Sequence, residues 1–442
     1  MQCAIDVQPC IRSVRLHSEG AYRSKRPAIT DSNHTTSAEA RRSTKRAGPL
    51  SGLRVLDAGN MIAGPLAATQ LADFGADVIK IEMPGIGDSM RHWAPMKEGR
   101  SLWWKVIGRN KRLITLALSK PRAQQLFREL VRDADILIEN FKPGTFEKWG
   151  LGFAELSKIN PRLIMVRVSG FGQTGPYAKR GGYGTIAESF SGIPSFTGFP
   201  DKPPTLPGFP LADSVAATFS AMSAMFAIYN RAHGDGKGQE IDVSLYEPLF
   251  RLVESQVIGF DQLGIVKQRQ GNRLAEDSPR NTYQTRDGRW VGISASSQRT
   301  FERLAEAIGM PELITDPRFV DNTSRCDTDV ALDTIIAGWF ARYDCDDAMA
   351  LFEKADVVAG PVLDIRDIVR DPQYIARQNI VPVADDDFGS VRMQGVVPRF
   401  IGTPGEVRHS GRALGADNVE VYTGLLGLSP SELDELIAQG VI

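Results

Sequence analysis

The segment "LSGLRVLDAGNMIAGPLAATQLADFGADVIKIEMPG", from Leu50 to Gly85, specifies the fold expected for this chain. Leu53–Asp57 and Ala76–Glu82 are short apolar runs typical of buried strands, and Pro65–Phe74 between them has apolar residues at helical spacing. A strand, a helix and a second strand in this order predict a βαβ unit, whose two strands lie parallel in one sheet.

The alternation continues beyond this unit. Strand-like runs follow at Arg112–Leu118, Asp135–Asn140 and Arg162–Gly170, and Lys120–Ala134 has helical spacing. The pattern predicts an α/β fold with a Rossmann-like, mainly parallel sheet and helices on both of its faces. Ligands bind such sheets beyond the carboxyl ends of the strands, where the loops "AGNMIAGP", "ENFKPG" and "SGFGQTGPY" fall.

Composition and pattern divide the chain into five segments. Residues 1–48 are rich in Ser, Thr, Arg and Lys and predict a disordered tail that is dispensable for folding and turnover. Residues 49–245 are expected to form the first part of a large domain, followed by a linker helix over 246–269. Residues 270–362 predict a smaller α+β domain, because Asn281–Ser294 is a hairpin pattern with an Asp-Gly turn. Residues 363–442 return to the large domain and end in a helix capped by Ser429.

The composition excludes several classes of function. The 442 residues are 42% hydrophobic and 24% charged, the profile of a globular protein. The 52 basic and 53 acidic side chains nearly cancel, so we expect no nucleic-acid partner and no membrane partner. No apolar run approaches the length of about 18 residues that spans a bilayer. The four cysteines and five histidines are scattered, so we expect no metal site and no disulfide framework.

These features favour a cytoplasmic enzyme. A mitochondrial location is the alternative if the basic tail is a transit peptide, although its four acidic residues count against that interpretation. The first βαβ unit also suggests a dinucleotide-binding enzyme. However, Gly59 and Gly64 are five residues apart, and no G-x-G-x-x-G pattern is present to form a pyrophosphate turn.

The chain contains a series of short sequence motifs in a fixed order. They are "PLSGLRVLD", "AGP" at Ala63–Pro65, "GADVIKIE", "NKR" at Asn110–Arg112, "DILIENFKPGT", "SGFGQTGPY", "ADS" at Ala212–Ser214, "GKGQEIDVSLYE" and "AGPV" at Ala359–Val362. Each motif alone is weak evidence of a particular family. Together, from Leu50 to the C-terminus, they resemble the class III CoA-transferase family, which includes formyl-CoA, carnitinyl-CoA and succinyl-CoA transferases.

This resemblance implies a fold, an assembly and a chemistry. The large domain is built from both chain ends with a smaller domain inserted, and two chains form an interlocked homodimer. CoA moves from an acyl-CoA donor to a free carboxylic acid through an aspartyl-CoA thioester, without a metal or redox cofactor. The family aspartate corresponds to Asp213, at the start of a long helix rich in Ala, Ser and Met that we expect to be buried. A helix N-terminus is expected to keep such a carboxylate ionised. Without the resemblance, the position of Asp213 before a long helix would indicate an ordinary helix N-cap.

Other site residues follow from the same resemblance. Positions where the family contacts the adenine, pantetheine or phosphates of CoA, or the thioester, correspond to Ala63, Leu116, Asn140, Phe141, Lys142, Lys148 and Tyr183. Likeness to the succinyl-CoA branch predicts a short dicarboxylic acid as acceptor. Arg91 and Arg280 are candidates to bind its second carboxylate, although either one also reads as an ordinary surface ion-pair residue.

The sequence departs from parts of the family pattern. Ile62 and Met83 stand where formyl-CoA transferases carry a glutamine and an arginine, and Gly184 replaces a common acidic residue. Two alternatives stay open, an α-methylacyl-CoA racemase and a non-catalytic partner subunit. Racemisation needs two opposed bases, and Tyr183 stands at the position of the racemase histidine. A tyrosine, with an ordinary pKa of about 10, is a poor base near neutrality.

Overall fold

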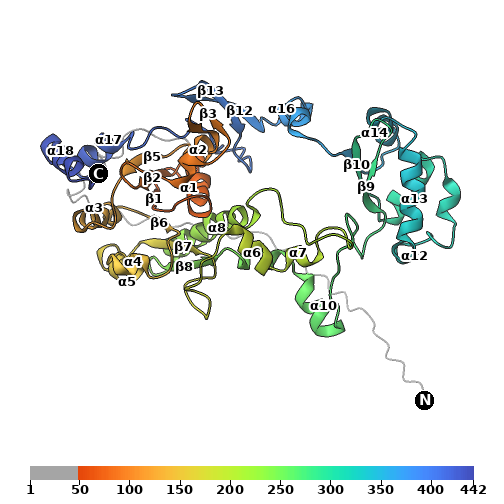
Figure 1. Ribbon diagram of the computed structural model, residues 1–442, viewed down its shortest axis with the longest axis horizontal. Coiled ribbons are helices and arrows are strands. Elements are labelled where there is room, and N and C mark those ends of the chain that lie inside the picture. Colours follow the sequence, from red (N-terminus) through yellow and green to blue (C-terminus); the bar gives the residue numbers. More distant parts are fainter. Residues whose placement is uncertain (1–47) are drawn as a thin grey trace, which may run out of the picture. The chain divides into compact units, whose positions relative to one another are not determined.

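A computed structural model describes residues 48–442 and contains a six-stranded parallel sheet (Figure 1). The strand order is β5-β2-β1-β6-β7-β8, and every neighbouring pair is parallel. The predicted α/β fold class is therefore confirmed. The prediction of a disordered tail concerns residues that lie outside the described part, Gly48 excepted. The strands are β1 (Arg54–Asp57), β2 (Asp77–Glu82), β5 (Arg112–Thr115), β6 (Ile136–Glu139), β7 (Ile164–Ser169) and β8 (Glu240–Ser244).

Side chains of the strands alternate between two hydrophobic clusters, one on each face of the sheet. In β1, Val55 packs with helices α1 (Ala63–Asp73) and α8 (Leu211–His233), whereas Leu56 packs in the opposite cluster. That second cluster includes side chains of five further helices: α3 (Pro121–Arg132), α4 (Thr145–Lys148), α5 (Phe153–Ile159), α17 (Asn418–Gly424) and α18 (Pro430–Ala438). The continuous apolar strands thus reflect burial on both faces, as is usual in a parallel sheet.

The C-terminal part of the chain binds the β5 edge of this sheet. The backbone N–H of Leu113 donates to the Asp417 carboxylate at 2.6 Å, and the N–H of Ala117 donates to the carbonyl of Val441 at 2.9 Å. The final helix begins as predicted, with Ser429 as N-cap and a capping box completed by Glu432. Residues more than 300 positions apart in sequence therefore share one core.

Helix α8 differs from expectation in its start and its exposure. It begins at Leu211, two residues before Asp213, and Pro210 occupies the N-cap position. Its alanines pack mainly against α1, but Phe226 and Tyr229 are 64% and 68% exposed, so burial is confined to one face. Among residues 48–442, α8 is the one helix long and apolar enough to cross a membrane by length and composition, and its buried alanine face accounts for part of that hydropathy.

Residues between Tyr283 and Val357 form a hydrophobic cluster of their own. The predicted hairpin is present as β9 (Arg280–Gln284) and β10 (Trp290–Ser294), with Gly288 at a φ of 82° in the turn. Strand β11 (Ala359–Pro361) completes this small antiparallel sheet. Its helices are α11 (Gln298–Ala307), η3 (Pro311–Ile314), α12 (Asn322–Asp327), α13 (Asp329–Phe340) and α14 (Cys345–Lys354).

Residues 246–269 contain two short helices where the sequence predicts one linker helix. These are α9 (Glu247–Leu252) and α10 (Ser255–Leu263), and none of the α10 side chains is buried. The five segment boundaries themselves stay predictions. The remaining elements are η2 (Ser89–His92), β3 (Met96–Lys97), β4 (Arg100–Ser101), α2 (Leu102–Ile107), α6 (Gly184–Phe190), α7 (Ile193–Phe196), α15 (Ile365–Ile368), α16 (Pro372–Ala376), β12 (Ile380–Asp385) and β13 (Gly389–Gln394).

Candidate active site

The strand order of the large sheet reverses between β1 and β6. The loops that follow these two strands meet there, because the backbone N–H of Asn60 donates to the Asn140 side-chain oxygen at 2.7 Å. In return, the Asn140 side-chain nitrogen donates to the Asn60 carbonyl at 2.8 Å. Such a reversal is where open α/β sheets bind ligands. Asn140, a predicted CoA contact, therefore lies at this edge of the sheet.

A cavity of about 170 Å³ opens beside these loops. Its lining includes Leu116 and Phe141, two predicted CoA contacts, and the Phe141 ring meets the Trp149 ring with centroids 5.2 Å apart. Lys142 and Lys148 are exposed, in the loop after β6 and in α4. Ala63 is buried at the first position of α1 and does not line the cavity, so any contact to a ligand would come from its backbone.

Two buried lysines hold the loop after β1 in place. Lys111 Nζ lies 2.8 Å from Asp57 Oδ2, and Lys80 Nζ lies 2.8 Å from Asp88 Oδ2 and donates to the Gly59 carbonyl. Burial opposes ionisation of Asp57, but the two ammonium groups outweigh it and hold the pKa of Asp57 below its ordinary value. Neither lysine was predicted from the sequence as a site residue, although Lys80, in the middle of the apolar strand "VIKIE", is a signal of a buried ion pair.

Arg167 holds the segment between β6 and α4. Its guanidinium lies 2.7 Å from Glu139 and 2.6 Å from Glu147, which immediately precede Asn140 and Lys148. Glu139 also accepts a 2.7 Å hydrogen bond from the backbone N–H of Phe141. Burial raises the pKa of Glu139 to about 7 despite its partner Arg167. The predicted CoA-binding segment is thus anchored at both ends by one arginine.

Asp213 lies at the third position of α8, where it faces the start of α6. Its carboxylate approaches Gly184 so closely that a Cβ on this glycine would lie 2.3 Å from Asp213 Oδ2. Glu188, one helical turn after Gly184, is also buried and accepts a 3.2 Å hydrogen bond from the backbone N–H of Ala212. Two carboxylates of adjacent helices therefore share one site.

The helix terminus does not hold the pKa of Asp213 at or below its ordinary value, although the carboxylate stays largely ionised near neutral pH. Burial of the carboxylate, followed by repulsion from Glu188, raises the pKa of Asp213 to about 6. The Asp213 side chain does not cap the helix, because Pro210 is the N-cap residue and no side-chain capping hydrogen bond is present there. The N-cap interpretation of Asp213 is therefore wrong. A partly buried, uncapped carboxylate of raised basicity is the form expected of a nucleophile.

Sequence comparison identifies the family to which this arrangement belongs. The profile described as "CoA-transferase family III" matches residues 50–418. The chain belongs to this family. The resemblance noted in the sequence is thereby confirmed, and the protein is a CoA-transferase of class III.

Known members of the family cover most of the chain. It is 46% identical to succinyl-CoA–D-citramalate CoA-transferase of Chloroflexus aurantiacus over 89% of this chain and 98% of that one. It is 38% identical to the alpha subunit of succinyl-CoA–L-malate CoA-transferase of the same species, over 89% of this chain and 92% of the relative. A solved CAIB/BAIF family protein from Brucella suis is 32% identical, with a TM-score of 0.76, and covers 88% of this chain and 100% of that one.

Two groups of family positions emerge from the geometry of this CoA-transferase. Leu116 and Phe141 line the cavity beside the strand-order reversal, and Asn140 is hydrogen-bonded to Asn60, which also lines it. Asp213 does not line that cavity and lies instead against the start of α6, which Tyr183 immediately precedes. Tyr183 is 78% exposed and directly precedes Gly184, the residue that the Asp213 carboxylate approaches.

The two arginines predicted to bind an acceptor carboxylate have other partners. Both Glu82 oxygens accept from Arg91, at 2.6 and 2.7 Å, and the Arg91 guanidinium stacks 3.9 Å from the centroid of the Trp104 ring. Arg91 thus forms an internal ion pair in this structure, and its assignment as a substrate ligand stays a prediction. Arg280 is exposed in β9 and donates to the Asn272 carbonyl at 2.9 Å.

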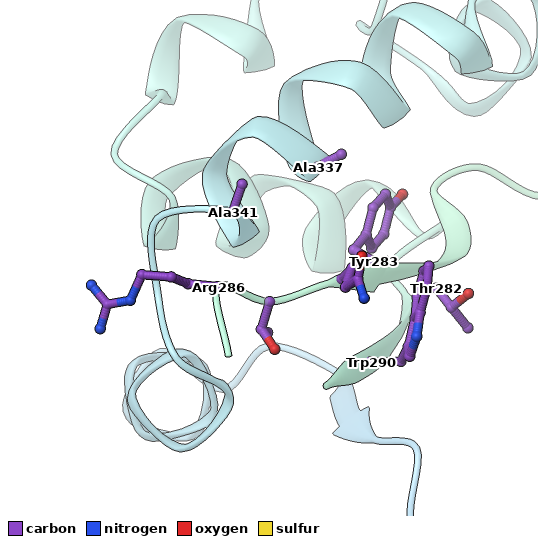
Figure 2. A pocket seen from close by; sticks show the side chains of 8 residues that line it. Thr282, Tyr283, Arg286, Trp290, Ala337 and Ala341 are labelled. Carbon is purple, nitrogen blue, oxygen red and sulfur yellow. The ribbon is translucent and has the colours of Figure 1, made fainter. Parts of the chain in front are cut away.

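A larger cavity, of about 540 Å³, lies between the β9–β10 hairpin and α13. Figure 2 shows Ala337 and Ala341 of α13 on one side and Tyr283 and Trp290 of the hairpin on the other. None of the predicted site residues lines it. The Tyr283 hydroxyl, which lines this cavity, already donates to Asp333 at 2.5 Å.

Proposed function

We propose that this enzyme transfers coenzyme A from succinyl-CoA to a dicarboxylic acid of four or five carbons, through an aspartyl-CoA thioester on Asp213. The observation that carries the proposal is the half-buried, unpaired Asp213 carboxylate against Gly184. Among the described residues, no lysine, arginine or histidine forms an ion pair with it. The acids in the relatives' names, citramalate and malate, support the substrate class.

The proposed chemistry balances without a cofactor. Asp213 Oδ attacks the thioester carbonyl carbon of succinyl-CoA, a C–O bond forms, and the C–S bond breaks as the CoA thiolate leaves with its electron pair. The thiolate then attacks the Asp213 side-chain carbonyl, forms a C–S bond and expels succinate. The acceptor carboxylate repeats the first step on this aspartyl thioester, and the thiolate returns to the acceptor acyl carbon. Asp213 is regenerated, and no proton changes hands.

The cavity beside the strand-order reversal suits the CoA moiety. Phe141 and Trp149 offer aromatic faces, and Leu116 offers an apolar wall. Lys142 and Lys148 are exposed cations near the carboxyl end of β6, available to the phosphates as point charges rather than as bidentate forks. The anchoring of this segment by Arg167 would present both lysines on a fixed backbone.

A panel of acceptors tests the substrate class. The purified protein is incubated with succinyl-CoA or acetyl-CoA and single carboxylic acids, and the CoA esters formed are measured by mass spectrometry. We expect succinyl-CoA to be the preferred donor and C4 or C5 dicarboxylic acids to be the preferred acceptors. A preference for monocarboxylic, aromatic or bulky acids would overturn the assignment. Exchange of the donor α-proton without transfer to any acid would instead identify a racemase.

We further propose that the chain works as a homodimer. Large apolar side chains are exposed together on α10, which buries none of its own residues, and on the outer face of α8. Exposed apolar area on this scale is typical of an assembly interface. Relatives are named as alpha and beta subunits of succinyl-CoA–L-malate CoA-transferase, so an unlike pair is the alternative. Light scattering of the protein expressed alone should give twice the chain mass together with activity, whereas an active monomer would contradict the proposal.

A further inference from the structure

Glu188 is a buried carboxylate to which the transfer chemistry has so far given no role. Its side chain is 5% exposed, and its Oε1 accepts a 3.2 Å hydrogen bond from the backbone N–H of Ala212. Among residues 48–442 it forms no ion pair with a lysine, arginine or histidine. A buried acid without a counter-charge is unfavourable for stability, so its presence beside Asp213 calls for a reason.

Helix α6 presents Gly184 and Glu188 on the same face, because residues four apart in a helix lie one above the other. The first of them leaves the space that the Asp213 carboxylate occupies, since a Cβ there would lie 2.3 Å from Oδ2. The second bonds to the backbone immediately before Asp213. The two carboxyl groups are thus held towards each other by the packing of α6 against α8.

Other charged groups on the elements packed against α8 do not offset this pair. Only Glu188 acts electrostatically on Asp213 among the described residues. The remaining charged side chains on those elements have partners of their own. Asp73 of α1 pairs with Arg109, and Arg167 of β7 pairs with Glu139 and with Glu240 of β8. Asp242 of β8 accepts from the backbone N–H of Gln173, and in α9 Glu247 accepts from Ser244 and Arg251 pairs with Glu254.

We propose that Glu188 is a positioning residue for the transfer reaction, whose buried negative charge destabilises the free Asp213 carboxylate and so favours the neutral aspartyl-CoA thioester. This inference rests on the proposed function. When Asp213 attacks the donor, its negative charge departs with the thiolate and finally with succinate. The repulsion from Glu188 is relieved in that step. The Glu188 charge therefore raises the free energy of the starting state but not that of the covalent intermediate. The raised pKa of Asp213 is consistent with this repulsion.

Glu188→Gln isolates the charge, because the amide oxygen can still accept from the Ala212 N–H. The enzyme is mixed with succinyl-CoA and succinate at a fixed ratio, without acceptor, and the aspartyl-CoA adduct is measured by intact-protein mass spectrometry from pH 5 to 8. In the wild type, adduct formation should be half-maximal near pH 6. In Glu188→Gln the midpoint should move to lower pH by about half a unit, since burial, the larger cause, stays in place. The ratio of adduct to free enzyme at pH 7.5 should fall about threefold, the equivalent of that shift.

The outcomes separate this inference from the function on which it rests. If the wild type forms no adduct at any pH, the proposed function fails. If the wild type forms it and Glu188→Gln keeps the same midpoint and ratio, the role of Glu188 is refuted. Glu188→Ala is the second neutral variant, and it decides the question if the glutamine variant does not fold. Glu353→Gln, a charge removal at an exposed position of α14, should match the wild type in every measurement.

Discussion

Asp213→Asn is expected to abolish CoA transfer while leaving the protein folded. The amide has nearly the shape of the carboxylate but carries no negative charge to attack the thioester, so the rate of transfer should fall at least about 10³-fold. Incubation with succinyl-CoA alone should give a covalent CoA adduct on the wild type and none on the variant, by intact-protein mass spectrometry. Hydroxylamine should trap the wild-type adduct as a hydroxamate at residue 213.

The stability of Asp213→Asn provides the control. The folded-state pKa of Asp213 is raised from 3.8 to about 6, so the folded protein holds this proton more tightly than the unfolded chain does. Stability is therefore lost as the pH rises through that window, and the loss is complete above pH 6. A neutral amide avoids this loss, so at pH 8 the variant should unfold at the same temperature as the wild type or a higher one. A folded variant with wild-type turnover would exclude Asp213 as the nucleophile.

The local pattern predicted the sheet well because its signals are short-range. Val55 and Leu56 are adjacent apolar residues that pack on opposite faces, and this continuous burial is what an apolar run between turn residues indicates. The placement of the loops after β1 and β6 at one edge of the sheet was predictable, since loops that follow parallel strands share the carboxyl edge, but the contact between Asn60 and Asn140 required the strand order of the structure. The capping box at Ser429 is likewise a four-residue pattern that the structure reproduces.

Interactions between segments distant in sequence were not predictable in this way. Arg91 was a candidate substrate ligand because its guanidinium can bind a carboxylate with two hydrogen bonds. Its contacts with Glu82 and with the Trp104 ring cannot be assigned from sequence. The basicity of Asp213 was predicted from its helix terminus alone. Its environment depends on the burial of the carboxylate and on Glu188 in another helix, and these outweigh a terminus effect of about 1 kcal/mol.

Helix α8 shows the same distinction within one element. Its small residues predicted close packing, and they do pack against α1. The exposure of Phe226 and Tyr229 on the opposite face could not be predicted from composition. A helix that is apolar on both faces has the same sequence pattern whether its second face packs against the same chain or against a partner.

Gly184→Ala is expected to impair catalysis far more than stability. The new Cβ would lie 2.3 Å from Asp213 Oδ2, a separation that two such atoms cannot keep. The atom in conflict is the end of a side chain rather than a backbone atom, so the conflict is relieved by rotation of the Asp213 carboxylate. Alanine is otherwise compatible with the first position of α6, and the melting temperature should change by only a few degrees.

The displaced group is the proposed nucleophile, so the cost of Gly184→Ala falls on the reaction. A misplacement of about 1 Å at a reacting atom lowers a rate about 10²-fold, and we expect a loss of that order in the rate of aspartyl-CoA formation, measured by rapid mixing with succinyl-CoA and intact-protein mass spectrometry. The matched control is Gly338→Ala in α13, where a Cβ meets nothing within 4 Å and the rate should be unchanged. Wild-type kinetics in Gly184→Ala would mean that the carboxylate reacts from a different position. If Gly184→Ala is folded but slow and Gly338→Ala has the wild-type rate, the rate depends on the space that Gly184 leaves open.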